Sequence, residues 1–104
     1  MLSIGVIGAG HLGKIHLKLL KELTSYRLVG FYDNDVNTRQ QVSETLGITA
    51  YDNAESLIEA SDVVDIVTPT LSHFKYAMLA LNAGKHIFIE KPITHTLQEA
   101  EELI

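Results

Sequence analysis

The sequence has 104 residues, which is enough for one domain and too few for two. Its 46% hydrophobic and 20% charged residues suit an ordinary globular domain, and the absence of Cys excludes a disulfide framework, a thiolate metal site and a Cys nucleophile. A net charge of −5 without a basic run argues against nucleic acid as a partner. No apolar stretch approaches the roughly 20 residues that a membrane span needs, so we expect no membrane partner and a cytoplasmic location.

Strand-like and helix-like segments alternate along the first half of the chain. The β-rich runs Leu2–Ile7 and Tyr26–Tyr32 predict two strands. Between them, residues 11–23 predict a helix, because apolar residues recur there at helical spacing, at Leu12, Ile15, Leu19 and Leu23. A second helix is predicted over 35–46, with Asp35 as its candidate N-cap and Gly47 just past its end.

The middle of the chain continues the same alternation. A weak third strand is predicted over 48–51. A short helix follows over 53–60, and either Asp52 or Asn53 is placed to cap it. Residues 63–67 then predict a fourth strand, which a single Asp interrupts.

The last segments complete a further strand–helix–strand unit. A helix is predicted over 70–83, with Gly84 as its stop and with apolar residues on one side, at Leu71, Phe74, Met78 and Leu81. His86–Ile89 predicts a fifth strand. The Thr-x-x-Glu pattern of residues 96–99 fits a capping box that opens a last helix.

This order of elements predicts an α/β fold. Strands that alternate with helices form a parallel sheet with right-handed crossovers and with helices on both faces. We therefore expect a Rossmann-type, doubly wound sheet with the strand order 3-2-1-4-5, in a three-layer α/β/α arrangement.

The most specific local pattern is Gly8-Ala9-Gly10-His11-Leu12-Gly13, which matches G-x-G-x-x-G. It follows a predicted strand and opens a predicted helix, and Asp33 lies 20 positions after Gly13, at the end of the second strand. This context indicates a dinucleotide-binding loop. The alternative is a structural glycine turn, with Asp33 serving only as a capping residue.

Each part of the pattern has a physical reason. Gly8 would let the chain turn sharply, Gly10 would let a pyrophosphate approach the backbone, and Gly13 would let the helix pack closely on the strand. The free N–H groups and the dipole at the start of the helix attract phosphates. His11 occupies a variable position of the motif and borders the phosphates through its backbone.

The residues after the second strand bear on the choice of cofactor. Asp33 would accept hydrogen bonds from a ribose diol, and its carboxylate would repel a 2′-phosphate. Asn34 and Asp35 follow it, so no Lys or Arg stands next to Asp33 to receive that phosphate. The sequence therefore favours NAD over NADP. NADP stays an alternative because Arg39, one to two turns into the next helix, could swing towards the site.

A polar segment, Thr68-Pro69-Thr70-Leu71-Ser72-His73, follows the fourth strand. Ligands bind at the carboxyl ends of the strands in a doubly wound sheet, so we expect this loop beside the cofactor. Pro69 stiffens the loop and Thr70 could cap the next helix. His73 is either close to the cofactor or a partly exposed helix residue. The remaining His residues show no metal-ligand spacing, so we expect no metal site.

A third polar cluster, Glu90-Lys91-Pro92, follows the fifth strand directly. Lys91 is either a solvated surface lysine or a residue of the site. Its place at the carboxyl end of a strand, on the cofactor side, distinguishes it from the other lysines.

With these three clusters, the sequence resembles the glucose–fructose oxidoreductase / inositol dehydrogenase / MocA-type (Gfo/Idh/MocA) family. The glycine motif is shared by many dinucleotide enzymes. Glu-Lys-Pro after the fifth strand, with Thr-Pro-x-x-x-His before it, is much more specific. The resemblance covers essentially the whole chain.

The resemblance implies an oxidoreductase that transfers hydride between nicotinamide and a sugar, cyclitol or related alcohol, in either direction. It implies that Lys91 lies at the nicotinamide end and contacts the reacting oxygen, and that Glu90 and the loop 68–73 line the cofactor. Family members carry a second domain that supplies an Asp/His pair and most of the substrate pocket, and usually forms the oligomer interface. We therefore expect residues 1–104 to be a truncated NAD(P)-binding domain of a homo-oligomer, with the substrate domain absent.

Two other classes of protein remain as alternatives. A non-catalytic NAD-binding sensor or regulatory module would suit the length of the chain. Glu90-Lys91-Pro92 favours the enzyme, because a sensor needs no lysine at the nicotinamide carbon. A methyl-donor-binding transferase also uses a glycine loop and an acid after the second strand, but the full G-x-G-x-x-G at this spacing argues against it.

Overall fold

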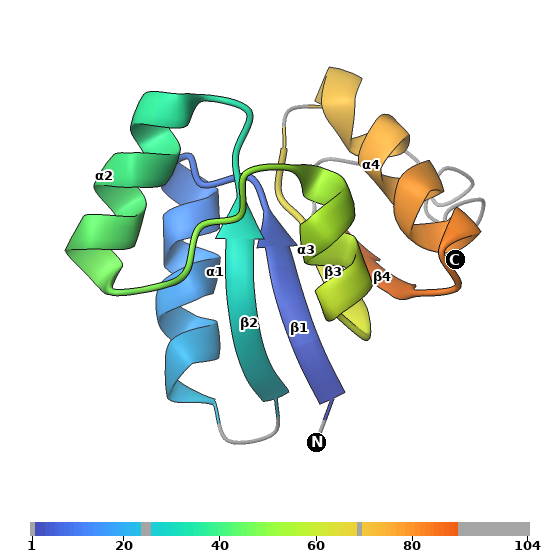
Figure 1. The fold of residues 1–104 in the computed structure, drawn as a ribbon, viewed down its shortest axis with the longest axis horizontal. Helices are drawn as coiled ribbons and strands as arrows, with labels where there is room; N and C mark the ends of the chain where they lie inside the picture. The colour runs from blue at the N-terminus through green and yellow to red at the C-terminus, as the bar shows by residue number, and fades with distance from the viewer. Residues whose placement is uncertain (1, 24–25, 69, 90–104) are drawn as a thin grey trace.

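A computed structural model describes residues 2–23, 26–68 and 70–89, with the backbone alone for 70–73, 88 and 89. Its helices and strands follow the predicted alternation (Figure 1). In chain order they are β1 (Leu2–Ile7), α1 (His11–Glu22), β2 (Tyr26–Tyr32), α2 (Val36–Leu46), α3 (Ala54–Ala60), β3 (Val63–Ile66), α4 (Thr70–Asn82) and β4 (His86–Ile89). None of the described helices is long and apolar enough to cross a membrane.

The four described strands form one parallel sheet in the order β2-β1-β3-β4. β3 and β4 are the predicted fourth and fifth strands. The predicted strand 48–51 is reduced to one parallel bridge between Phe31 and Ala50, at the outer side of β2. When this bridge is counted as the predicted third strand, the sheet has the predicted order 3-2-1-4-5.

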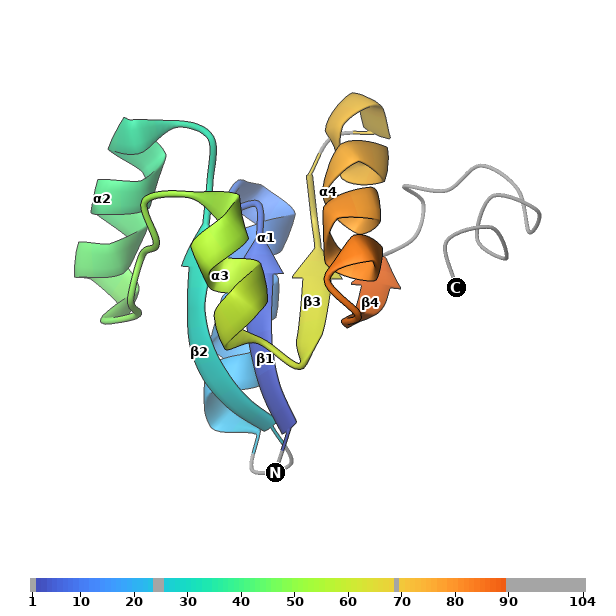
Figure 2. The same cartoon turned by 45° about the vertical axis from the view of Figure 1, so that its right-hand side comes forward.

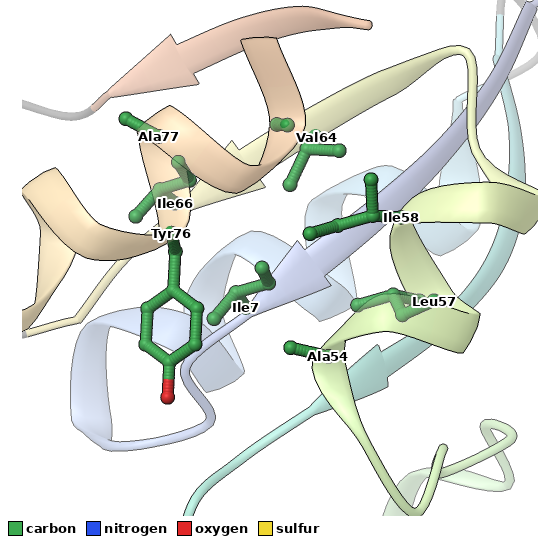
Figure 3. Packing of buried hydrophobic residues seen from close by; sticks show 9 residues of the cluster. Ile7, Ala54, Leu57, Ile58, Val64, Ile66, Tyr76 and Ala77 are labelled. Carbon is green, nitrogen blue, oxygen red and sulfur yellow. The ribbon is translucent and has the colours of Figure 1, made fainter. Parts of the chain in front are cut away.

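The sheet is covered by helices on both faces, which confirms the three-layer prediction (Figures 1 and 2). One core cluster joins the sheet to α1 and α2: Val6, Ala9, Leu17, Phe31, Val42, Ile48 and Val67. The other joins it to α3 and α4 (Figure 3): Ile7, Ala54, Leu57, Ile58, Val64, Ile66, Tyr76, Ala77 and Ala80. All of these side chains are at most 9% exposed.

The apolar spacing that predicts α1 and α4 does not mark the buried faces of these helices. Leu19 is 59% exposed and Phe74 is 55% exposed, and the other described large apolar residues of the two predicted stripes are also at the surface or only partly buried. The buried face of α1 carries Gly13 and Leu17, while that of α4 carries Tyr76 and two alanines. Small residues let a helix approach the sheet closely, so the larger apolar residues lie on the flanks.

The helix ends show the predicted capping chemistry. The Asp35 carboxylate accepts a hydrogen bond from the Asn37 amide at 3.1 Å, and Gly47 ends α2 with a left-handed φ of 67°. Of the two candidate caps for α3, Asn53 is the one that caps it, accepting from the Ser56 amide at 2.8 Å. Gly84 follows α4 with a φ of 75°. The predicted capping box at 96–99 lies outside the described residues.

The Asp that interrupts the fourth strand has a structural partner. Asp65 is 2% exposed, and its Oδ2 lies 2.6 Å from Nδ1 of His16 on α1. A carboxylate buried in the middle of a sheet is costly without a partner. This pair links α1, which carries the glycine motif at its start, to the central strand β3.

Candidate functional site

A cavity of about 600 Å³ opens at the carboxyl ends of β1, β2 and β3. Its lining comes from three loops and from α1, α2 and α4. The lining residues are Ile7, Gly8, Gly10, His11, Leu12, Gly13, Asp33, Asn34, Asp35, Thr38, Val67, Thr68 and Tyr76. A second, mostly apolar cavity of about 300 Å³ lies between α1, β1 and β3 and contains none of the predicted site residues.

Two of the motif glycines are required by close backbone contacts. Gly8 has a φ of 105° and donates its N–H to the Tyr32 carbonyl at 2.8 Å, and a Cβ added to it would lie 2.6 Å from the Val67 carbonyl oxygen. A Cβ on Gly13 would overlap the Gly8 carbonyl, at 2.7 Å from its carbon. The start of α1 is therefore pressed against the turn that leaves β1.

Gly10 is in a different environment from the other two glycines. It is the N-cap of α1 and has no side chain that could form a capping hydrogen bond. A Cβ added to it would meet no atom within 4 Å. No packing inside the described chain requires a glycine here. An open backbone at a helix N-terminus can receive a phosphate group.

Asp33 ties the glycine loop to the turn after β2. Its Oδ2 accepts the Ala9 amide at 2.7 Å and its Oδ1 accepts the Asp35 amide at 2.8 Å. The side chain of Ala9 is fully buried, so Ala9 contributes to the loop through its backbone amide. An ionised carboxylate has about four acceptor positions. Two of these are used, and Asp33 retains the capacity to accept from a ribose diol.

Arg39 does not line the cavity. Its Nη1 donates to the carbonyl oxygens of Asp33 at 3.2 Å and Asp52 at 3.4 Å, and its guanidinium lies 5.4 Å from the centre of the Tyr32 ring. These contacts hold the guanidinium between α2 and the segment before α3. A swing towards a 2′-phosphate would break all of them.

The segment after β3 is described in part. Thr68 lines the cavity, and its hydroxyl oxygen is buried with no hydrogen-bond partner among the described residues. Thr70 and His73 lie in the first turn of α4, and their side chains are outside what the structure describes. Pro69, Glu90 and Lys91 also lie outside the described residues.

Several residues that line the cavity belong to none of the sequence motifs. Asp35 and Thr38 come from the start of α2, where the Asp35 carboxylate accepts from the Thr38 hydroxyl at 2.9 Å. Tyr76 comes from α4, and burial raises the pKa of its phenol, with smaller contributions from Tyr32, Asp33 and Glu55. Tyr76 is not on the predicted apolar side of its helix, and no sequence motif marks it. Within the described part of the chain, no three His, Asp or Glu side chains come together as a metal site would require.

Comparison with known proteins identifies the family. Residues 2–104 match the family described as "Oxidoreductase family, NAD-binding Rossmann fold". The chain therefore belongs to the Gfo/Idh/MocA oxidoreductase family. This confirms the resemblance drawn from the glycine motif, the Thr-Pro-x-x-x-His segment and Glu-Lys-Pro.

Individual relatives give the same result. The UDP-N-acetylglucosamine 3-dehydrogenase of Acidithiobacillus ferrooxidans is 39% identical over 96% of this chain and 31% of its own length, and its solved structure superposes with a TM-score of 0.85, at 37% identity over 98% of this chain and 33% of that one. Inositol 2-dehydrogenase of Serratia proteamaculans is 35% identical over 99% of this chain and 32% of its own length.

The solved structure of a third relative contains NADP+. The biliverdin reductase of Synechocystis, solved with biliverdin and NADP+, is 26% identical with a TM-score of 0.83, over 98% of this chain and 33% of that one. The present chain thus spans about a third of the length of the relatives that it matches.

Proposed function

We propose that residues 1–104 form the dinucleotide-binding domain of a dehydrogenase that acts on a sugar, cyclitol or related alcohol. The observation that carries this proposal is the cavity at the carboxyl ends of the strands, where the glycine loop and Asp33 are hydrogen-bonded together. The dehydrogenase names of the relatives favour an enzyme over a sensor or regulatory module. A second domain would supply the substrate pocket and the contacts between subunits.

The residues around the cavity fit a dinucleotide. Gly10 leaves open space beside the N-terminus of α1, where a pyrophosphate can reach free backbone N–H groups. The Thr68 hydroxyl, which has no partner among the described residues, can bond to the ligand. His11, Leu12 and Asn34 complete the lining of this half. When bound, the nicotinamide ring exchanges a hydride with the substrate carbon.

We further propose that the cofactor is NAD rather than NADP. The Asp33 carboxylate lines the cavity and would lie against the adenosine ribose, where a 2′-phosphate meets its negative charge. Arg39 is the first cationic residue after Asp33 in the sequence, and its guanidinium donates to two main-chain carbonyls instead.

Replacing Asp33 by Ser tests the choice of cofactor. We expect NAD to bind more tightly than NADP to the unmodified chain, and Asp33→Ser to narrow that difference. A lost hydrogen bond to a charged group weakens NAD binding by about 1.5–3 kcal/mol, while relief of the charge repulsion favours NADP. Isothermal titration with both cofactors measures the ratio.

The matched control is Asp52→Ser, which removes an exposed carboxylate from the neighbouring segment outside the cavity. This variant should keep the preference for NAD. An unchanged preference in Asp33→Ser, in a chain that keeps its circular dichroism spectrum, contradicts the role assigned to Asp33.

We propose Lys91 as the catalytic residue that this chain contributes. It directly follows Glu90 after β4, and the family resemblance assigns it to the reacting oxygen. Removal of hydride from an alcohol carbon builds negative charge on the oxygen as its proton leaves, and a lysine ammonium stabilises that charge. A group of the second domain would take the proton. Glu90, Pro69, Thr70 and His73 are proposed to line the cofactor.

Replacing Lys91 by Ala in an enzyme that contains this domain should lower kcat by about 100- to 1000-fold, the usual cost of losing one charge-stabilising donor. The Kd for NAD should change much less. Lys85→Ala is the control, because Lys85 precedes β4 at the opposite end of the strand. Near-normal turnover of Lys91→Ala would show that Lys91 is a solvated surface lysine without a role in the reaction.

A further inference from the structure

Tyr76 connects the core beneath α4 to the cofactor cavity. The residue is only 7% exposed and belongs to the cluster that joins α3 and α4 to the sheet. Figure 3 shows its ring beside Ile7, with the hydroxyl pointing away from the other labelled side chains of the cluster. Tyr76 also lines the cavity that contains Gly8 and Asp33. Its ring therefore belongs to the core, and its polar end reaches the site.

The hydroxyl of Tyr76 has no partner among the described residues. No described group forms a hydrogen bond with it, and it is not one of the buried polar atoms that lack a partner, so the hydroxyl is open to the cavity that Tyr76 lines. Burial, with smaller contributions from Tyr32, Asp33 and Glu55, raises the pKa of the phenol above its ordinary value, and a phenol is already protonated at neutral pH without such a shift. The group is therefore a hydrogen-bond donor facing the cavity.

The neighbours of Tyr76 place it close to the carboxyl end of β2. Its ring packs edge-to-face against Tyr32, with the ring centres 6.4 Å apart and the planes at 66°. Tyr32 is the last residue of β2, and Asp33 follows it directly. The ring contact therefore places Tyr76 close to the turn that carries Asp33, the carboxylate that is proposed to meet the adenosine ribose.

We propose that the Tyr76 hydroxyl binds the adenosine half of the dinucleotide by donating a hydrogen bond to one of its acceptor atoms. This inference rests on the proposed function, because it needs a dinucleotide in the cavity. It adds a binding residue from α4, in the middle of the helix, to the loop residues that the sequence motifs select. The Tyr32–Tyr76 ring contact fixes the position of the donor before the ligand arrives.

The test compares NAD with ADP-ribose, which contains the adenosine half and lacks nicotinamide. Both ligands are titrated into the unmodified chain, Tyr76→Phe and Tyr51→Phe. Tyr76→Phe keeps the ring that packs on Tyr32 and removes only the hydroxyl. Tyr51→Phe is the matched control, because Tyr51 packs against the same cluster but does not line the cavity. Thermal unfolding of each chain without ligand checks the fold.

We expect Tyr76→Phe to weaken the binding of NAD and of ADP-ribose by the same factor, about 2- to 12-fold, and Tyr51→Phe to bind both ligands normally. If Tyr76→Phe binds both ligands as the unmodified chain does, the Tyr76 inference fails while the dinucleotide site stands. A loss for NAD alone also overturns it, because the contact would then be to the nicotinamide half. Absence of NAD binding by the unmodified chain overturns the proposed function and this inference together.

Discussion

Replacing Gly10 by Val should abolish most NAD binding and leave the domain folded. In the described chain no atom lies within 4 Å of a Cβ at this position, and the backbone has a φ of −70° that any residue can adopt. The fold should therefore lose only about 1 kcal/mol, the usual cost of a poor N-cap residue. In the complex, the branched side chain would occupy the space that the pyrophosphate needs.

The expected loss of affinity is large because charged hydrogen bonds are lost. A bond to a charged group is worth about 1.5–3 kcal/mol, so displacing the phosphates from two N–H groups costs more than about 100-fold in Kd. Isothermal titration measures this loss. Ala83→Val, which adds the same branched side chain at an exposed position after α4 and outside the cavity, is the control and should bind NAD normally. Unchanged affinity in folded Gly10→Val would show that the phosphates bind elsewhere.

Replacing Gly13 by Ala should destabilise the domain, although alanine is the better helix former. In an open helix position the exchange stabilises by up to about 1 kcal/mol. Here the new Cβ overlaps the Gly8 carbonyl, which is backbone and cannot move aside as a side chain can. Overpacking of this kind costs about 1–3 kcal/mol and more where backbone is involved. We expect a net loss of about 3 kcal/mol in the free energy of unfolding, measured by urea denaturation.

Gly10→Ala is the matched control for this experiment. It makes the same substitution three residues earlier, at a position where the added Cβ meets open space. Its free energy of unfolding should stay within about 1 kcal/mol of the unmodified chain. Equal stability of the two variants would contradict the close packing of α1 against the turn after β1.

The sequence predicts the fold well because the information is local. The alternation of strands and helices, the caps at Asp35 and Gly47, and the G-x-G-x-x-G motif each depend on short-range patterns that the structure reproduces. Handedness rules then restrict the sheet to very few topologies. The predicted strand at 48–51 is the weakest of these elements, and only a single bridge forms there.

The buried faces of α1 and α4 could not be predicted from the same patterns. Apolar periodicity finds the side of a helix with large apolar residues, and on both helices the close contacts are made largely by small ones, such as Gly13 and Ala77. Tyr76 was missed for a related reason. Tyr76 is 43 residues from Asp33 in the sequence. Only the three-dimensional arrangement shows that this core tyrosine lines the same cavity as Asp33.

The two hydrogen bonds that the Asp33 carboxylate accepts from backbone amides could not be predicted from the sequence. The spacing from the glycine motif identifies Asp33 as a ligand-binding candidate. It does not reveal that the carboxylate accepts from the Ala9 and Asp35 amides and so holds the glycine loop in place. Substitution of Asp33 should therefore affect the shape of the loop as well as the contact with the ribose.

Calorimetric titration of the unmodified chain with NAD and NADP shows whether this chain carries a dinucleotide site. We expect saturable binding of one NAD per chain, with NADP bound more weakly because the Asp33 carboxylate opposes its extra phosphate. The glycine loop, Asp33 and Thr68 all line one cavity, so this chain itself contains the residues that the proposed cofactor site needs. Absence of saturable NAD binding by a folded chain would show that residues 1–104 do not form a dinucleotide site.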